Sequence, residues 1–289
     1  MKIGVVGLGI IGSRLAASWR RAGHEVYGWN RTKEHAAGLG LPLCETPAEL
    51  AGRCEAVMVV VSDPAALDAV LGGPAGIAKT PLAGKLVMNA TTVDAAASRR
   101  ACAAVQAAGG HFVETPFTGS KDGAETAKLV FYVGGDADVV RRAEPLLLQV
   151  GARIFHFGPV GAASDVKLAM NLMIANIMQA MVEAVALVNA AGVDMGVFEE
   201  AYRMNASWCA LSAMKLPKLL AKDFSPHFSI KHMNKDMGLA LKRAAELDVE
   251  LPHTQHIREL LEQIARQGMG DLDFSALACR QQQVQTAPA

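Results

Sequence analysis

The pattern of apolar and polar positions divides the chain into two parts. Up to about residue 160, short apolar runs alternate with amphipathic stretches, and the run AVMVVV at residues 56–61 contains no polar residue. A strand without alternation is typical of a parallel sheet covered on both faces. Beyond residue 160 the apolar positions follow a helical period. The pattern therefore predicts an α/β domain with a doubly wound sheet over residues 1–160 and an all-α domain over residues 161–289.

Individual elements follow from the same pattern. In the first domain we expect a helix over residues 13–22 and strands over residues 2–6, 24–29, 56–61, 85–89, 111–114, 128–134 and 153–157. In the second we expect helices over residues 161–192, 195–205, 214–222, 232–247 and 254–267. The sequence GPVG at residues 158–161 marks the boundary. The Gln-rich residues 280–289 are expected to form a frayed tail.

The longest apolar stretch, residues 161–192, is expected to be one continuous helix that joins the two domains. A membrane span needs ~20 predominantly apolar residues. Polar side chains interrupt every window of about that size, namely Lys167, Asn171, Asn176, Gln179 and Glu183. We therefore expect a buried helix of a soluble protein, with no membrane partner.

Composition narrows the class of function. The chain has 28 basic and 28 acidic residues, so it lacks the positive charge that binding to nucleic acid or an anionic membrane demands. Its five cysteines form no CxxC pair and no metal-site spacing, which indicates free thiols in a reducing compartment and no metal. The apolar N-terminus is broken by glycines and is not expected to be a secretory signal. Small-molecule chemistry in the cytoplasm is therefore the expected role.

A glycine motif follows the first strand directly and leads into the first helix. It consists of Gly7, Leu8, Gly9, Ile10, Ile11 and Gly12. In a Rossmann dinucleotide-binding domain the first glycine makes a tight turn, the second lets the backbone approach a pyrophosphate, and the third lets the helix pack on the strand. The pyrophosphate then lies at the helix N-terminus. The order of strand, glycine turn and helix predicts dinucleotide binding rather than an ordinary turn.

The end of the second strand indicates which dinucleotide is bound. An acidic residue there would hold the ribose 2′-hydroxyl of NAD. The chain has Asn30, Arg31 and Thr32 instead, and a guanidinium can pair with a 2′-phosphate. NADP is therefore expected in preference to NAD, unless Arg31 is only a solvated turn residue.

Other candidate residues follow later strands. Val61 and Ser62 end the third strand at the edge of the sheet where cofactors bind. Thr92 either contacts the cofactor or caps the helix that follows it. Thr118, Gly119 and Ser120 form either a turn or a loop whose backbone N–H groups receive a carboxylate.

Two lysine sites stand out on otherwise apolar helices. Lys167 and Asn171 are four residues apart, so they share one helix face. Considered alone, they would be solvated at the end of the helix, because Lys is rarely buried. Lys231 and Lys235 repeat the same spacing, with Asp236 adjacent. Together with the glycine turn and the hydroxyl loop, these pairs reverse that preference, so we expect Lys167 to face a cleft rather than solvent.

Seven motifs along the chain occur in the order and spacing of one known family: GLGIIG, NRT, TTVD, TPFTGSK, VKLAMN, KHMNKDM and GDLDFSA. The family is that of the β-hydroxyacid dehydrogenases, which the chain resembles over nearly its whole length. Within that family it is most similar to the NADPH-dependent glyoxylate and succinic semialdehyde reductases. The resemblance implies hydride transfer from NADPH to a small carboxylate-bearing carbonyl compound, and a homodimer or homotetramer.

The resemblance also implies residue roles. Lys167 would be the catalytic proton donor and Asn171 would orient the substrate. The loop at Thr118, Gly119 and Ser120 would bind the substrate carboxylate, Phe228 and Asp236 would line the substrate pocket, and Thr92 and Lys235 would contact the cofactor.

The chain departs from the family pattern at two places. Thr118 stands where the family more often has Ser, and the bulky segment at residues 204–209 replaces a Gly- and Lys-rich one. Within it, Trp208 belongs either to the core or to the pocket.

Three alternative functions remain. One is a 3-hydroxyisobutyrate-type or other β-hydroxyacid dehydrogenase. A second is an imine reductase, which the presence of Lys167 disfavours because those enzymes usually lack this lysine. The third is a non-catalytic NADP-binding module, which Lys167 and Lys235 disfavour.

Overall fold

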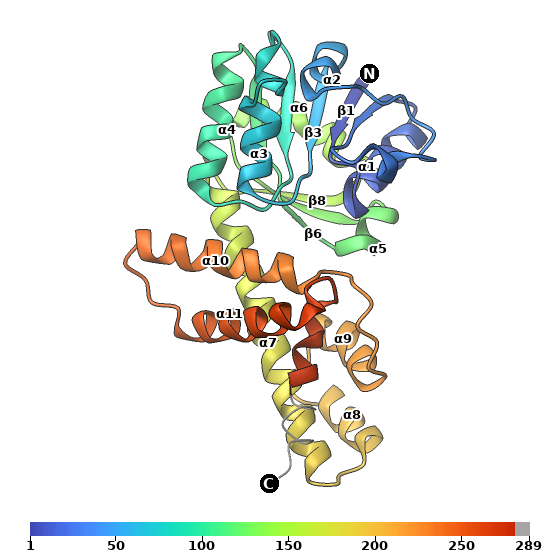
Figure 1. The fold of residues 1–289 in the computed structure, drawn as a ribbon, viewed down its shortest axis with the longest axis vertical. Coiled ribbons are helices and arrows are strands. Elements are labelled where there is room, and N and C mark those ends of the chain that lie inside the picture. The colour runs from blue at the N-terminus through green and yellow to red at the C-terminus, as the bar shows by residue number, and fades with distance from the viewer. Residues whose placement is uncertain (281–289) are drawn as a thin grey trace. The chain divides into compact units, whose positions relative to one another are not determined.

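The structure is a computed structural model that describes residues 1–280 (Figure 1). It contains two compact units, the first spanning Met1–Leu168 and the second beginning at Ala169. The predicted tail lies outside the described residues except for Arg280. The division into domains at residue 160 stays a prediction.

A five-stranded parallel sheet forms the centre of the first unit. Its strand order is β2-β1-β3-β4-β5, with β1 at Lys2–Val6, β2 at Glu25–Trp29, β3 at Ala56–Val59, β4 at Leu86–Asn89 and β5 at His111–Glu114. The chain reverses its direction of winding between β1 and β3, which places a topological switch point at their carboxyl ends. The predicted doubly wound fold is confirmed.

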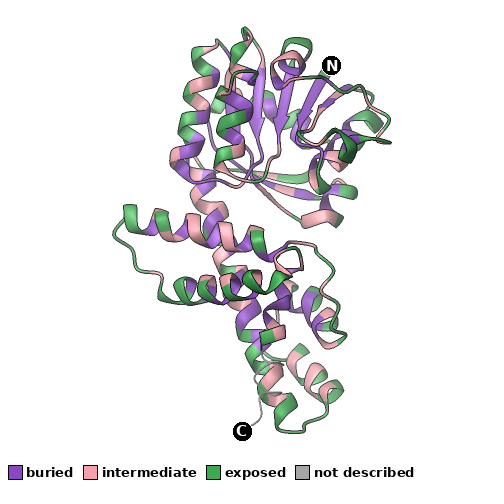
Figure 2. Ribbon diagram, in the orientation of Figure 1, coloured by how far each residue is buried: buried purple, intermediate pink, exposed green. Residues whose placement is uncertain are grey.

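Helices cover both faces of this sheet, whose strands are buried (Figure 2). Their bounds are Ile10–Arg21 for α1, Pro47–Arg53 for α2, Pro64–Gly72 for α3, Ala95–Ala107 for α4, Ser120–Glu125 for α5 and Ala137–Leu147 for α6, with the 3₁₀ turns η1 at Lys33–Ala36 and η2 at Ile77–Lys79. One face packs on α1 and α6, where the indole N–H of Trp19 donates to the carbonyl of Leu146 at 3.0 Å. The other face packs on α2, α3 and α4.

A smaller sheet of three strands completes the first unit. It contains β6 at Phe117–Thr118, antiparallel to β7 at Leu129–Val133, which is parallel to β8 at Gly151–His156. Strand β8 begins before the predicted residue 153, because a register shift at Leu129 lets Gly151 pair there.

Two other predicted bounds are corrected. The first helix begins at Ile10 rather than at residue 13, because Gly9 already acts as its N-cap. Strand β3 ends at Val59 rather than at residue 61, because the backbone N–H of Val61 turns away to the side chain of Thr91.

The second unit is helical, as predicted. The long helix α7, Ala162–Ala190, begins in the first unit and continues into the second. The elements after it are α8 at Met195–Arg203, α9 at Ala210–Leu220, α10 at Ile230–Glu246, α11 at Pro252–Ile264, a π-helical turn η3 at Ala265–Met269 and a 3₁₀ turn η4 at Phe274–Ala278. Its core combines side chains of α7, α9, α10, α11 and η4, among them Met178, Leu216, Met237, Leu261 and Phe274. Helices α10 and α11 lie side by side (Figure 1).

Helix α7 is long and apolar enough to cross a membrane by length and composition, and it is the one such helix within residues 1–280. One third of its most apolar 18-residue window, 33%, is buried inside the structure. On the buried side, Ala175, Met178 and Val182 pack into the core of the second unit.

Candidate active site

The glycine loop between β1 and α1 contains two tightly packed positions and one open position. A Cβ atom at Gly7 would lie 2.0 Å from the carbonyl oxygen of Val60, and one at Gly12 would lie 1.8 Å from that of Gly7. A Cβ atom at Gly9 would meet no atom within 4 Å. The loop therefore leaves open space beside its backbone at the N-terminus of α1, which is the arrangement that a pyrophosphate requires.

Asn30 connects the end of β2 to the glycine loop. Its Oδ1 accepts a hydrogen bond from the backbone N–H of Leu8 at 3.0 Å, and its Nδ2 donates to the carbonyl of Thr32 at 2.7 Å. The side chain of Arg31 is exposed. The three residues expected to contact the ribose therefore follow a strand end that is fixed to the glycine loop.

The carboxyl ends of β3 and β4 are joined through Thr91 and Asn89, which the sequence analysis did not single out. The backbone N–H of Val61 donates to Thr91 Oγ1 at 3.1 Å, and the N–H of Thr91 donates to Asn89 Oδ1 at 3.1 Å. Asn89 Nδ2 is buried and has no hydrogen-bond partner among the described residues. A buried donor at this edge fits a ligand that brings an acceptor.

The cap of α4 removes one interpretation of Thr92. The carboxylate of Asp94 accepts from the backbone N–H of Ala97 at 2.7 Å, which makes Asp94 the N-cap. Thr92 precedes the cap and is half-buried. The capping alternative for Thr92 is therefore wrong, and cofactor contact stays a prediction.

The predicted carboxylate-binding loop links β6 to α5. Gly119 and Ser120 both adopt positive φ angles, 122° and 53° respectively, an unusual conformation for Ser. The hydroxyl of Ser120 accepts from the backbone N–H of Lys121 at 2.6 Å. Burial raises the pKa of the nearby Tyr132 phenol, and the Thr118 side chain opposes that shift. The structure thus adds Tyr132 as a neighbour of Thr118.

Helix α7 carries the predicted catalytic lysine and its partner one turn apart. Lys167 is half-buried and Asn171 is buried. Asn171 Nδ2 donates to Asp236 Oδ2 at 2.6 Å, and Lys235 Nζ lies 2.8 Å from Asp236 Oδ1. Three predicted site residues, Asn171, Lys235 and Asp236, are therefore brought together within the second unit.

The second lysine of α10 has a different environment. Lys231 forms an ion pair with Asp271, and its side chain is 57% exposed against 20% for Lys235. Lys231 is therefore an ordinary surface residue, although its sequence neighbourhood resembles that of Lys235.

Phe228 is held by a buried ion pair that the sequence did not reveal. Its ring lies 6.2 Å from those of His232 and Phe274, and its backbone N–H donates to Asp273 Oδ2 at 3.1 Å. Asp273 Oδ1 lies 2.6 Å from Lys215 Nζ, and both side chains are at most 2% exposed. Burial alone would raise the pKa of Asp273, but the Lys215 ammonium and nearby N–H and O–H donors outweigh it and lower that pKa.

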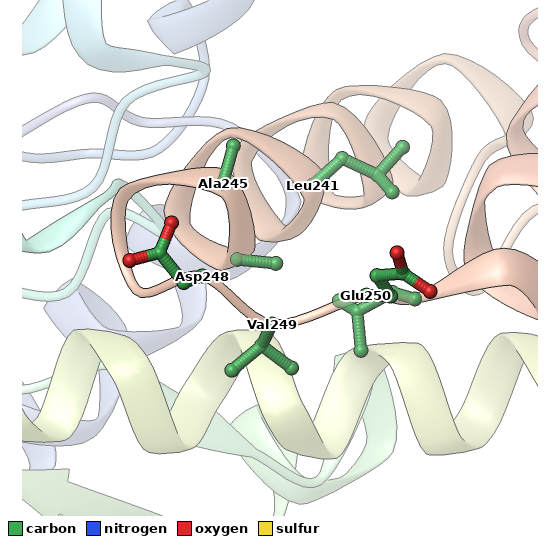
Figure 3. A pocket seen from close by; sticks show the side chains of 7 residues that line it. Leu241, Ala245, Asp248, Val249 and Glu250 are labelled. Atoms are coloured by element: carbon green, nitrogen blue, oxygen red, sulfur yellow. The ribbon is translucent and has the colours of Figure 1, made fainter.

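The second unit has two further features, Trp208 and a surface depression. Trp208 is half-buried, with Tyr202 edge-on at 5.1 Å and the Arg203 guanidinium over its ring at 5.0 Å. A depression at the turn between α10 and α11 contains none of the predicted site residues (Figure 3). It is lined by Leu241, Ala244, Ala245, Asp248, Val249, Glu250 and Leu251.

Comparison with known proteins identifies relatives over the whole described chain. Residues 2–158 match the family described as the NAD binding domain of 6-phosphogluconate dehydrogenase, and residues 161–280 match the NAD-binding domain of NADP-dependent 3-hydroxyisobutyrate dehydrogenase. Glyoxylate/succinic semialdehyde reductase 1 of Arabidopsis thaliana is 32% identical over 280 residues, covering 96% of this chain and 97% of the relative. The 2-hydroxy-3-oxopropionate reductase of Escherichia coli (strain K12) is 29% identical and covers 96% of each chain.

A solved structure of similar fold is that of 3-hydroxyisobutyrate dehydrogenase from Mycobacterium tuberculosis. It superposes with a TM-score of 0.87 at 26% identity and covers 99% of each chain.

Proposed function

We propose that this chain, which belongs to the β-hydroxyacid dehydrogenase family, is a reductase that uses NADPH to convert a small aldehyde acid or keto acid to the hydroxy acid. As a member of this family it is an oxidoreductase with a nicotinamide cofactor. The proposal adds the direction, NADPH as the preferred cofactor, and glyoxylate or succinic semialdehyde as the type of substrate.

The observation that carries the proposal is the buried contact between Asn171 and Asp236, one helical turn beyond Lys167. A structural helix has little reason to bury an amide against a carboxylate that also pairs with a lysine, since each polar group loses its hydration. Orientation of a polar substrate is a sufficient reason, because the contact with Asp236 fixes the direction in which the Asn171 amide points.

The cofactor site is assigned to the first unit. The open side of Gly9 would receive the pyrophosphate, Arg31 and Thr32 the 2′-phosphate, and Val61, Ser62 and Thr92 further parts of the dinucleotide. Lys235 is proposed as a further residue that contacts the cofactor. Bound NADPH supplies the hydride for the carbonyl carbon.

The remaining chemistry belongs to side chains of the protein. In the proposal, Thr118, Gly119 and Ser120 receive the substrate carboxylate, while Phe228 and Asp236 form part of the substrate pocket. Lys167 donates a proton from its ammonium group to the carbonyl oxygen as negative charge develops there. Asn171 fixes the orientation of the substrate.

The role of Lys167 is tested by Lys167→Ala. We expect turnover to fall at least ~100-fold, the lower end of general-acid contributions, with NADPH affinity nearly unchanged. Lys231→Ala is the matched control, because this lysine lies on the surface and pairs with Asp271. Normal turnover of the Lys167 variant would overturn the assignment.

Cofactor preference is tested by Arg31→Asp. The new carboxylate would repel a 2′-phosphate and accept a hydrogen bond from a 2′-hydroxyl, so NADPH affinity should fall relative to NADH. Arg141→Asp, on the exposed surface of α6, makes the same charge change elsewhere and should preserve the preference. An unchanged ratio in the Arg31 variant would refute the assignment.

The substrate is tested by an NADPH-consumption screen over glyoxylate, succinic semialdehyde, methylmalonate semialdehyde and a cyclic imine. Reduction of either of the first two is the expected result. Preference for methylmalonate semialdehyde would favour a 3-hydroxyisobutyrate-type enzyme, and preference for the imine would favour an imine reductase. NADPH binding without turnover of any of them would favour a non-catalytic module.

Assembly and location complete the proposal. Large apolar side chains are exposed on α7 and α8, including Leu187 at 73% and Val197 at 62%. A helix face of this kind in a soluble enzyme is expected to be covered by another copy of the chain. We therefore infer a homodimer or homotetramer, and size-exclusion chromatography with light scattering would contradict this by showing a monomer. The proposed cytoplasmic location rests on the five free cysteines, which suit a reducing compartment.

A further inference from the structure

Glu114, the last residue of β5, is a fully buried carboxylate with five hydrogen-bond donors around it. Its Oε1 accepts from the backbone N–H groups of Gly161 and Ala163, both at 2.8 Å, and more distantly from that of Ser164 at 3.4 Å. Its Oε2 accepts from the hydroxyls of Ser164 at 2.7 Å and Ser98 at 2.5 Å. The side chain is 0% exposed. Every contact is an N–H or O–H donor, which suits an acceptor-only carboxylate.

Most of these donors lie at the N-terminus of α7. The first backbone N–H groups of a helix have no partner within the helix, and a neighbouring side chain usually accepts from them. For α7 the acceptor comes from a strand of the central sheet, so the cap also joins the helix to the sheet. A negative charge at this end interacts favourably with the helix dipole as well.

Two glycines make room for this contact. A Cβ atom at Gly134 would lie 2.2 Å from Glu114 Oε1. Gly161 has a φ angle of +107°, and a Cβ atom there would lie 2.9 Å from Nη2 of Arg99. The backbone around Glu114 is thus shaped so that the start of α7 can approach the carboxylate closely.

The anchored turn immediately precedes Lys167. Lys167 follows Ala163 by four residues and Ser164 by three, so it lies over the anchored turn on the same helix face. Rotation or sliding of the first turn would therefore move the lysine side chain directly. All the residues involved belong to the first unit.

We propose that Glu114 is a positioning residue for Lys167: through Ala163 and Ser164 it fixes the rotation and height of the first turn of α7 on the sheet. Glu114 acts only through the lysine and does not contact the substrate. The inference rests on the proposed role of Lys167 as proton donor.

The two hydroxyls on Oε2 provide a matched test. Ser164→Ala and Ser98→Ala each delete one hydrogen bond to the same oxygen, but only Ser164 lies on α7, whereas Ser98 lies on α4. We expect Ser164→Ala to lower kcat about tenfold, and Ser98→Ala to leave it within about twofold, because a displacement on the order of 1 Å is enough to cost up to about 100-fold in rate. The Kd of NADPH should be unchanged in both, and thermal unfolding measures any loss of stability separately. Equal effects of the two variants on kcat would overturn the proposal.

Glu114→Gln gives an independent test. The amide keeps the shape but replaces one acceptor oxygen by a donor that faces N–H or O–H groups. We expect kcat to fall about 10- to 100-fold with NADPH binding retained, and no further loss when the change is made in the Lys167→Ala background. An additional loss in that background would overturn action through the lysine. If Glu114→Gln does not fold, the comparison of Ser164→Ala with Ser98→Ala decides whether Glu114 positions Lys167.

The outcomes separate this inference from the proposed function. Normal kcat in Glu114→Gln and Ser164→Ala, with Lys167→Ala impaired, overturns the positioning role and leaves the proton donor in place. Normal kcat in Lys167→Ala overturns both.

Discussion

The amide of Asn171 donates a 2.6 Å hydrogen bond to the carboxylate of Asp236, which links α7 to α10 in the second unit. The two residues are 3% and 1% exposed. Because an ionised carboxylate can only accept, Asn171 presents its NH₂ group to Asp236 and its carbonyl oxygen in another direction. The contact therefore determines which end of the amide is presented to a substrate on the proposed reaction path.

Asn171→Ala tests this link. The change leaves one oxygen of buried Asp236 without its donor, and an unsatisfied buried group costs about 1–3 kcal/mol. We expect a loss of that size in the free energy of unfolding, measured by urea titration, together with a lower kcat/KM. Asn176→Ala is the control, because that half-buried amide donates to the carbonyl of Leu172 in its own helix. Similar losses of stability and activity in both variants would contradict a special role for Asn171.

The glycine loop permits a prediction that separates folding from cofactor binding. At Gly9 a Cβ atom would meet nothing within 4 Å, whereas at Gly12 it would lie 1.8 Å from the carbonyl oxygen of Gly7. Gly9→Ala should therefore keep the melting temperature and weaken NADPH binding, because the methyl group occupies the space needed by the pyrophosphate. Gly12→Ala should lower the melting temperature itself. Thermal unfolding and fluorescence titration measure the two effects, and unchanged NADPH affinity in Gly9→Ala would place the pyrophosphate elsewhere.

The parts of the fold that the sequence predicted correctly depend on local order. Strand, glycine turn and helix are contiguous, so a turn at Gly7 followed by a helix is predicted from a short stretch of chain, although the helix begins at Ile10 rather than at residue 13. The continuous apolar run of β3 likewise indicates that this strand is buried on both faces, whichever strands lie beside it.

The parts that the sequence did not predict depend on contacts between distant segments. In the sequence Glu114 is only the last residue of a predicted strand, and the start of α7 comes into contact with it only in the folded chain. The Lys215–Asp273 pair joins α9 to the segment before η4, and neither residue has a local signal. Lys231 and Lys235 have the same local pattern, and only the position of Asp271 places one of them on the surface.

The buried pair should contribute strongly to stability. Lys215→Met removes the partner of a carboxylate that is 1% exposed, and breaking a buried ion pair typically costs about 3–5 kcal/mol. Lys231→Met, whose partner Asp271 is exposed, should change stability little. Urea unfolding of both variants provides the comparison. A small effect of Lys215→Met would mean that the Asp273 carboxylate is adequately held by its N–H and O–H donors alone.

His232 should make the stability of the second unit depend on pH. Burial lowers its pKa below the ordinary value of 6.5, helped by Lys235 and Lys231, while Asp236 and Asp271 oppose the shift. The unfolded chain therefore binds a proton at higher pH than the folded chain does, so stability is lost as the pH falls below about 6.5. His232→Gln should reduce this loss between about pH 7 and pH 5.5, where few carboxylates titrate. Urea midpoints measured across that range test the prediction, and identical pH profiles for the variant and the parent protein would contradict it.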